Sequence, residues 1–284
     1  MLKTKELKTQ ICVQKSHHTN GLIQEFQERF DPIASYLLSC SPSPAWLDNP
    51  EFIKKFKEFE ELVLDRRFDV IANNGALNRY RTKTAKLRQI DTFYEIFLET
   101  RAVLDLIQYG IPFETNAHLM RDYETAKLEG EAAGFDSSSK VAFVGCGPFP
   151  STAVSYLRIF GSNVVCIDNN PEAVVLANKV FEKLDLQNKI KVVYGDGINI
   201  DYIDFTHVVA AGIAQPKDKI LNRINQTARD DVRVVVRTTD GLRIFFYEPA
   251  ASFAENLCRY FTIKSKVVDK KNIFHSLVLT RKSK

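Results

Sequence analysis

The chain has 284 residues, of which 45% are apolar and 26% are charged, as is typical of soluble globular enzymes. Its net charge of +4 is spread along the chain without a long basic block, so nucleic-acid binding is not favoured. The five cysteines form no C-x-x-C pair. We therefore expect no disulfide framework, no protein-bound metal and a reducing, cytoplasmic location.

The length and the hydropathy pattern limit the architecture further. A chain of this size corresponds to one large domain or two modest ones. No stretch approaches the ~18 apolar residues of a membrane span, and Met1 to Lys8 has no apolar core of a secretory signal. We expect a protein that neither crosses a membrane nor is exported.

Helical periodicity dominates the first part of the chain. Residues 1–20 are polar and are interpreted as a loose leader. Apolar residues then recur at spacings of three and four, and Asn49-Pro50 combines a good N-cap with a good first helical residue. Long helices are predicted over 76–108 and 114–133. We therefore predict an all-helical domain over 1–135, which covers the substrate.

Strands and helices alternate after residue 139. Strands are predicted over 141–144, 164–167, 190–193, 206–211 and 232–237, with helices between them. Such alternation predicts an α/β fold with a parallel sheet. Further strands are predicted over 244–247, 261–268 and 274–279, the last two as an antiparallel pair at one edge. We predict a Rossmann-like domain over 136–284 that resembles a class I S-adenosylmethionine (SAM)-dependent transferase.

A glycine turn follows the first predicted strand. Gly145 and Gly147 allow the backbone to approach a ligand closely, before a helix whose N-terminus favours negative charge. Asp168 ends the second strand and can accept from both ribose hydroxyls. Asp196 follows the third strand and could accept from an adenine amine. The predicted cofactor-binding residues are Gly145, Cys146, Gly147, Pro148, Asp168, Asn169, Asp196, Gly197 and Ala211.

Each of these two acidic residues also has an alternative role that is purely structural. Asp168 could instead cap the helix that begins at Pro171, and Asp196 could be part of a plain Asp-Gly turn. The three strand ends together favour a ligand that contains adenosine, and both SAM and NAD fit this pattern.

Four residues outside the turn are candidates for substrate binding or catalysis. Arg237 and Arg243 suit bidentate binding of amino-acid carboxylates, although Arg243 could form only a surface salt bridge with Asp240. Glu99 borders the apolar stripe of a helix and could equally be a solvated acid. Tyr123 could be a core aromatic residue with its hydroxyl at the surface.

Three segments carry a resemblance to a known family. Residues 143–152, with proline after the glycine turn, resemble the nicotianamine synthase signature, and so do residues 210–217 and 237–247. A helical first half before a SAM-type second half also matches. The family includes plant and archaeal nicotianamine synthases and the bacterial histidine aminobutanoyltransferases that make staphylopine-type metallophores.

The resemblance implies an unusual use of SAM. An amine attacks the γ-carbon of the methionine-derived chain, a 3-amino-3-carboxypropyl (aminobutanoyl) group is transferred, and 5′-methylthioadenosine leaves. Glu99 would accept a proton from the attacking ammonium, Tyr123 would position the transferred chain, and Arg237 and Arg243 would bind carboxylates. The metal would belong to the product.

The acceptor would be histidine, another amino acid or a SAM-derived unit. The predicted protein partners are a downstream opine dehydrogenase and a second copy of this chain in a homodimer. Cys146 stands where the family often has a small residue. An ordinary class I SAM methyltransferase and a non-catalytic SAM sensor are the alternative functions.

Overall fold

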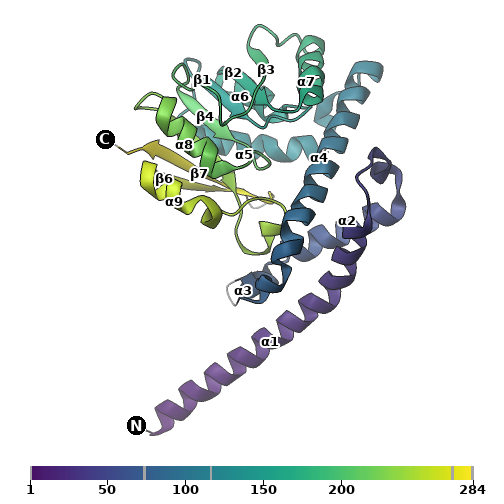
Figure 1. Ribbon diagram of the computed structural model, residues 1–284, viewed down its shortest axis with the longest axis vertical. Helices are drawn as coiled ribbons and strands as arrows, with labels where there is room; N and C mark the ends of the chain where they lie inside the picture. The colour runs from purple at the N-terminus through teal and green to yellow at the C-terminus, as the bar shows by residue number, and fades with distance from the viewer. Residues whose placement is uncertain (1, 73–74, 116, 270–271, 283–284) are drawn as a thin grey trace. The chain divides into compact units, whose positions relative to one another are not determined.

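The computed structural model describes residues 2–72, 75–115, 117–269 and 272–282 (Figure 1). Contacts divide the chain into two compact units, one of residues 1–94 with 240–246 and the other of residues 95–239 with 247–284. Residues 95–135, including the second half of one long helix, therefore group with the sheet. The domain boundary at residue 135 and the role of residues 1–135 as a substrate cover stay predictions.

The first unit is helical. Its elements are α1 (Leu2–Ser39), α2 (Pro50–Leu64), α3 (Asp69–Ala72), the beginning of α4 (Arg81–Tyr109), and short 3-10 turns η1 (Pro44–Asp48), η2 (Arg66–Phe68) and η3 (Ala76–Tyr80). The predicted loose leader is wrong, because α1 already begins at Leu2. Residues 1–20 contain neither proline nor glycine, so a helix can continue through them.

Aromatic side chains build the core of this unit. Phe30 stacks on Phe26 and packs edge to face with Tyr80, with ring centroids 4.8 Å apart in each pair. The predicted N-cap is confirmed, since the Asn49 side chain accepts from the backbone N–H groups of residues 51 and 52. The core also takes in a segment from late in the sequence, because the ring of Phe245 lies 4.7 Å from that of Phe30.

That segment corrects one predicted strand. Residues 244–247 were expected to be extended, whereas Gly241–Phe245 forms a 3-10 turn, η5. Gly241 has a φ of 60°, which starts a tight turn, and the turn brings the rings of Phe245 and Phe246 into the aromatic core. Local β propensity is overridden here by tertiary packing.

The second unit is built on a seven-stranded sheet of order β3-β2-β1-β4-β5-β7-β6. The strands are β1 (Lys140–Val144), β2 (Asn163–Asp168), β3 (Ile190–Tyr194), β4 (His207–Ala210), β5 (Arg233–Thr238), β6 (Phe261–Val268) and β7 (His275–Arg281). The first five are parallel, and β7 lies antiparallel between β5 and β6. The predicted α/β class and the antiparallel edge pair are thus confirmed.

Helices cover this sheet (Figure 1). They are the rest of α4, α5 (Ala117–Ala133), α6 (Ser151–Phe160), α7 (Pro171–Lys183), α8 (Lys217–Thr227) and α9 (Ala254–Tyr260), with short turns η4 (Phe113–Thr115) and η6 (Ala250–Phe253). The valines of β1, β4 and β5 are almost completely buried, as expected for central parallel strands. Order reverses between β1 and β4, which is where ligands bind in such sheets.

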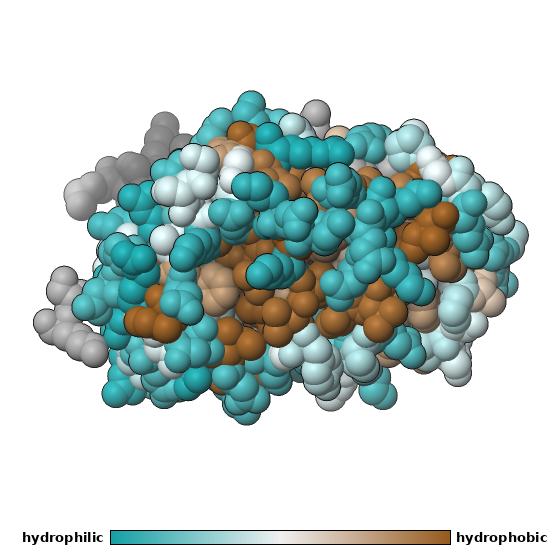
Figure 2. All heavy atoms as spheres, turned by 90° about the horizontal axis from the view of Figure 1, so that it is seen from above, coloured by the Kyte–Doolittle hydropathy of each residue, from teal (hydrophilic) through white to brown (hydrophobic). Residues whose placement is uncertain are grey.

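The face drawn in Figure 2 is mostly covered by hydrophilic residues, with apolar residues visible between them. Within the described part of the chain, no helix has the length and apolar character required to cross a membrane.

Candidate active site

A pocket of the second unit opens at the carboxyl ends of β1, β4 and β5. Residues from α4, α5, the glycine turn, the loop after β4 and the segments around β5 and β7 line it. They are Glu95, Glu99, Asp122, Phe143, Gly145, Cys146, Phe149, Ser151, Thr152, Ala211, Gly212, Ile213, Arg237, Tyr247 and Phe274. Five of the residues predicted from sequence are therefore brought together: Glu99, Gly145, Cys146, Ala211 and Arg237.

The glycine turn has the conformation that its sequence predicts. Gly145 and Gly147 have φ values of 76° and 68°, in the left-handed region that favours glycine. The Gly145 N–H donates to the carbonyl oxygen of Ile167 at 2.8 Å. The Gly147 N–H donates to Oδ2 of Asp168 at 2.9 Å. The turn is thus tied to the end of β2 at two points.

Asp168 fixes this turn and does not cap α7. Its Oδ1 accepts from the backbone N–H of Asn170 at 2.9 Å. The N-cap of α7 is Asn170, whose side chain accepts from the N–H of Glu172. The alternative interpretation of Asp168 as the cap is therefore wrong, and its predicted contact with a ribose stays a prediction. The neighbouring Asn169 is exposed.

Glu99 meets the glycine turn directly. Its Oε2 accepts from the Phe149 N–H at 3.5 Å, and a Cβ added to Gly147 would lie 2.4 Å from the same oxygen. Burial, followed by the charge of Glu95, raises the pKa of Glu99 well above its usual range, although the Phe149 N–H lowers it in part. A carboxyl group with a raised pKa can exchange a proton near neutral pH.

Two more carboxyl groups, which the sequence did not single out, line the same pocket. Glu95 lies one helical turn before Glu99 on α4, and its Oε1 accepts from the Tyr247 hydroxyl at 2.5 Å. Asp122 on α5 accepts from the Asn272 side-chain amide at 2.9 Å. The i, i+4 spacing of Glu95 and Glu99 was visible in the sequence, but no local feature of the sequence identified the partners that their carboxylates contact.

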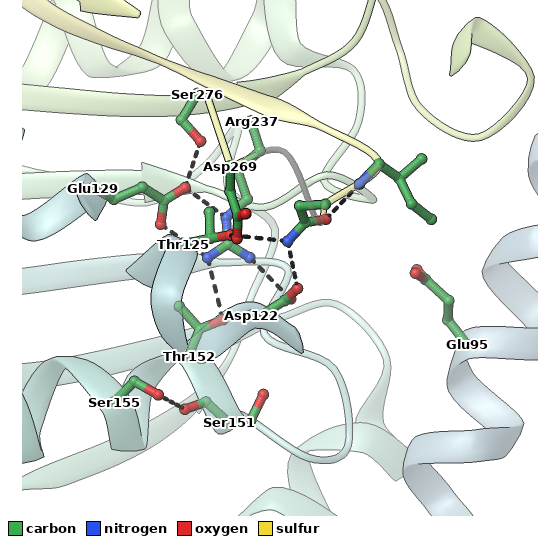
Figure 3. A network of polar contacts seen from close by, with 12 residues as sticks. Glu95, Asp122, Thr125, Glu129, Ser151, Thr152, Ser155, Arg237, Asp269 and Ser276 are labelled. Atoms are coloured by element: carbon green, nitrogen blue, oxygen red, sulfur yellow. Dashed lines mark hydrogen bonds and ion pairs between the residues drawn. The ribbon is translucent and has the colours of Figure 1, made fainter. Parts of the chain in front are cut away.

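Arg237 is held by protein carboxylates. Its Nε and Nη2 donate to the two oxygens of Glu129, each at 2.9 Å, and Nη2 also donates to Thr152 at 3.2 Å (Figure 3). Nη1 lies 3.6 Å from Oδ2 of Asp122. Burial alone would lower the pKa of Arg237, but Glu129, Tyr156 and Asp122 raise it. The guanidinium is therefore charged and fixed in place.

Glu129 is the centre of a buried network. It is completely buried and also accepts from the hydroxyls of Ser276, at 2.5 Å, and Tyr156, at 2.6 Å. A second branch joins Thr125 to Asp269 at 2.8 Å (Figure 3). The hydrogen bonds of this network connect α5 and α6 with β5 and β7 and so support one wall of the pocket.

The remaining predicted cofactor residues lie at neighbouring strand ends. Asp196 accepts from the N–H of Ile198 at 3.1 Å, so it does form a turn, and its adenine contact stays a prediction. A Cβ on Gly197 would lie 2.6 Å from Val144, which explains the glycine. The Ala211 N–H donates to the Val144 carbonyl oxygen at 3.0 Å. Pro148 is buried in the glycine turn.

Cys146 acts as a small apolar residue of the pocket wall. It is 5% exposed, and its thiol donates to the Gly147 carbonyl oxygen at 3.5 Å. The neighbouring Cys166 thiol and burial raise the pKa of Cys146. The thiol is therefore neutral, and it occupies a place in which a small side chain suffices.

Tyr123 and Arg243, which were predicted to act on the substrate, are not among the described residues that line the pocket. Tyr123 lies on α5 with 37% of its surface exposed, and its neighbour Asp122 faces the pocket instead. Arg243 belongs to the first unit, where its Nη2 contacts Asp69 at 3.0 Å and Asp240 at 3.1 Å. The pair with Asp240 that the alternative named is present, but Arg243 is 4% exposed and also pairs with Asp69, so it is not a surface salt bridge.

Among the residues that the structure describes, no group of three or more His, Cys, Asp or Glu side chains could hold a metal ion. The absence of a protein-bound metal stays a prediction.

Solved structures with the same fold were found by comparison. A mutant of MtNAS in complex with S-adenosylmethionine aligns with a TM-score of 0.78 and 22% identity, over 90% of this chain and 98% of that one. MtNAS in complex with MTA and tNA aligns with a TM-score of 0.79 and 22% identity, over 91% and 98%. At this identity the likeness establishes the fold, which confirms a helical region followed by a SAM-transferase-like sheet.

Two kinds of sequence comparison agree with each other. The family model described as "Nicotianamine synthase protein" matches residues 56–284. The L-histidine 2-aminobutanoyltransferase of Pseudomonas aeruginosa is 28% identical over 139 residues, which are 49% of this chain and 53% of that protein. The enzyme of the same name from Yersinia pestis is 25% identical over 156 residues, or 55% and 57%. The match thus spans about half the length of these curated relatives.

Proposed function

The chain belongs to the nicotianamine synthase family, and from this premise we propose that it transfers an aminobutanoyl group from SAM to an amine, releasing 5′-methylthioadenosine. The names of the matched relatives, which are L-histidine 2-aminobutanoyltransferases, support this reaction. So do the ligands of MtNAS, which was crystallised with SAM and with MTA and tNA. The acceptor would be histidine, another amino acid or a SAM-derived unit.

The observation that carries the proposal is the contact between Glu99 and the glycine turn. A base is needed because only a neutral amine is nucleophilic, and Glu99 is a carboxyl group of raised pKa at the pocket wall. Its Oε2 lies beside Gly147, in the turn expected to bind the leaving group. A proton acceptor is thus placed next to the donor site.

The described residues fit SAM as the donor. The left-handed conformations of Gly145 and Gly147 let the turn pack closely against Ala214 and Glu99. Asp168 ends β2, and Asp196 follows the neighbouring strand β3. We assign the adenosine part to Gly145, Cys146, Gly147, Pro148, Asp168, Asn169, Asp196, Gly197 and Ala211. The carboxylates of Glu95 and Asp122 line the pocket, and negative charge there favours a substrate that carries sulfonium and ammonium groups.

The proposed reaction is a displacement at the γ-carbon of SAM. The acceptor ammonium gives one proton to Glu99, and the resulting lone pair forms a bond to the γ-carbon of SAM. The bond between that carbon and sulfur breaks, and its electron pair stays on the sulfur, which becomes the neutral thioether of methylthioadenosine. The positive charge of the sulfonium passes to the newly bonded nitrogen. The protein contributes mainly by orientation and by the position of the base.

Arg237 has a narrower role than its sequence context predicted. Because Glu129 and Thr152 already accept from Nε and Nη2, a substrate carboxylate would have to accept from Nη1, beside Asp122. We propose that Arg237 chiefly holds the pocket wall. Substrate binding by Tyr123 and Arg243, a downstream opine dehydrogenase and a homodimer stay predictions of the resemblance. A cytoplasmic location stays a prediction from the cysteine pattern.

Product analysis tests the proposal. The purified protein is incubated with SAM alone and with SAM plus histidine, and the nucleoside product is identified by chromatography. Methylthioadenosine is the expected product, whereas S-adenosylhomocysteine without methylthioadenosine would indicate a methyltransferase. Tight SAM binding with no turnover against a panel of amino acids would indicate a sensor. Mass spectrometry of products from a mixed amino-acid pool identifies the acceptor.

A further inference from the structure

We propose that Glu95 and Tyr247 form a positioning pair that sets the charge environment in which Glu99 takes its proton. The inference rests on the proposed function, because it takes Glu99 as the base. It adds two residues to which the family resemblance assigned no role.

The pair is defined by close contacts within the second unit. Glu95 and Glu99 are four residues apart on α4 and both line the pocket, so their side chains project from the same helical face. The Tyr247 hydroxyl donates to Oε1 of Glu95 at 2.5 Å. In Figure 3, Glu95 projects from α4 toward the side on which Asp122 and Arg237 lie.

The ring of Tyr247 has little freedom to move. A Cβ added to Gly212 would lie 2.9 Å from Cδ1 and Cε1 of this ring, so the loop after β4 packs closely against it. The carbonyl oxygen of Tyr247 accepts from the Thr239 hydroxyl at 3.2 Å. Both ends of the residue are therefore fixed, and the hydroxyl can hold the Glu95 carboxylate in one position.

Among the described residues, several charged and polar groups act on Glu99, and the neutral Cys146 thiol lies in the same pocket wall. Glu95 comes from α4, Asp122 from α5, Asp168 from the end of β2 and the Phe149 N–H from the glycine turn, while Arg237 of β5 lines the same pocket. Among the charged groups, Glu95 acts most strongly on the pKa of Glu99. Asp122 lies beside Arg237, and Asp168 accepts from two backbone N–H groups.

Tyr247 stabilises the Glu95 carboxylate without adding a positive charge. A hydrogen bond to an ionised carboxylate favours the ionised form. A negative charge one turn from Glu99 in turn makes Glu99 a stronger proton acceptor. The pair would thus set the pH at which Glu99 changes from proton acceptor to neutral acid.

The test is the pH dependence of kcat/KM for methylthioadenosine release, whose acid limb reports the pKa of the base in the free enzyme. Glu95→Gln removes the negative charge, so the limb should move to lower pH by about one unit. Tyr247→Phe keeps the ring on Gly212 and should give a smaller shift in the same direction. Asp105→Asn removes a negative charge from the same helix outside the described pocket lining and should leave the limb in place.

Direct titration separates failure of this inference from failure of the proposed function. Carbon-13 NMR of labelled glutamate carboxyl groups, with the Glu99 signal assigned by its loss in Glu99→Gln, measures the pKa of Glu99 without turnover. A downward shift in Glu95→Gln supports the pair even if no transfer is detected. An unchanged titration in both Glu95→Gln and Tyr247→Phe, with circular dichroism confirming folded protein, would overturn it.

Discussion

Replacing Gly147 by alanine should reduce the rate of aminobutanoyl transfer much more than it reduces the stability of the fold. Gly147 has a φ of 68°, and an added Cβ would lie 2.4 Å from Oε2 of Glu99. Ordinary contact begins at 3.4 Å, so the carboxylate must retreat by about 3.4 − 2.4 = 1.0 Å. Because Oε2 is the end of a flexible side chain, it can move away at little cost in stability, but it then leaves the position proposed for the base.

Gly110 offers a matched control. Its φ is 66°, and an added Cβ would meet nothing within 4 Å. Both substitutions place an L-residue in the left-handed region, which costs about 1–2 kcal/mol. Only Gly147→Ala displaces Glu99, and a misplacement of about 1 Å can cost roughly 10²-fold in rate.

The assay combines guanidinium unfolding with the rate of methylthioadenosine release. Both variants should lose similar stability, while kcat/KM should fall roughly 100-fold in Gly147→Ala and stay within a few-fold in Gly110→Ala. Equal rates in the two variants, or a near-normal rate in Gly147→Ala, would refute the placement of Glu99 against the turn.

Three further predictions concern Glu129, Lys217 and Glu99. Glu129→Gln leaves the Arg237 charge buried without its paired carboxylate, so the free energy of unfolding should fall by about 3–5 kcal/mol in guanidinium titrations. Lys217 is completely buried, and its Nζ donates to the Gly212 carbonyl oxygen at 2.7 Å. Lys217→Met should therefore lower the free energy of unfolding by about 1–3 kcal/mol. It should also speed hydrogen exchange in the loop after β4. The raised pKa of Glu99 means that the folded protein binds more protons than the unfolded chain, so stability should fall as pH rises from 4.5 through the raised pKa, and Glu99→Gln should flatten that slope.

Each of these predictions has a comparison that could contradict it. Glu114→Gln breaks an exposed ion pair with Arg158 and should lower the free energy of unfolding by at most about 1 kcal/mol. An equally small loss in Glu129→Gln would contradict the stabilising role of the buried pair between Glu129 and Arg237. Unchanged exchange in the loop after β4 would show that Lys217 does not hold it. Equal pH slopes in the wild type and in Glu99→Gln would show that another group titrates.

The fold was largely predictable where local signals are strong. Short apolar runs ending in Gly145 or Asp168 marked strand ends, because parallel strands buried on both faces need continuous apolar sequence. The segment around Phe245 was misjudged because its rings pack onto Phe30 of α1, far away in the sequence. The helix over residues 2–20 was missed because polar sequence alone gives no amphipathic signal.

The site was predictable only in part. The glycine turn could be named from its local motif, whereas Glu99 could be named only from its position in the resemblance to the family. The partner of Arg237 could not, because Glu129 lies 108 residues away and an arginine after a strand does not specify which carboxylate it meets. For the same reason, the sequence could not identify Tyr247 as the partner of Glu95, which lies 152 residues away.

The most direct test of the account compares binding and transfer in Glu99→Gln. SAM affinity is measured by isothermal titration calorimetry, and methylthioadenosine is quantified after a single turnover with SAM and the identified acceptor. The account predicts SAM binding within a few-fold of the wild type and almost no methylthioadenosine. Near-normal methylthioadenosine formation in Glu99→Gln would contradict the central claim that Glu99 is the base for aminobutanoyl transfer.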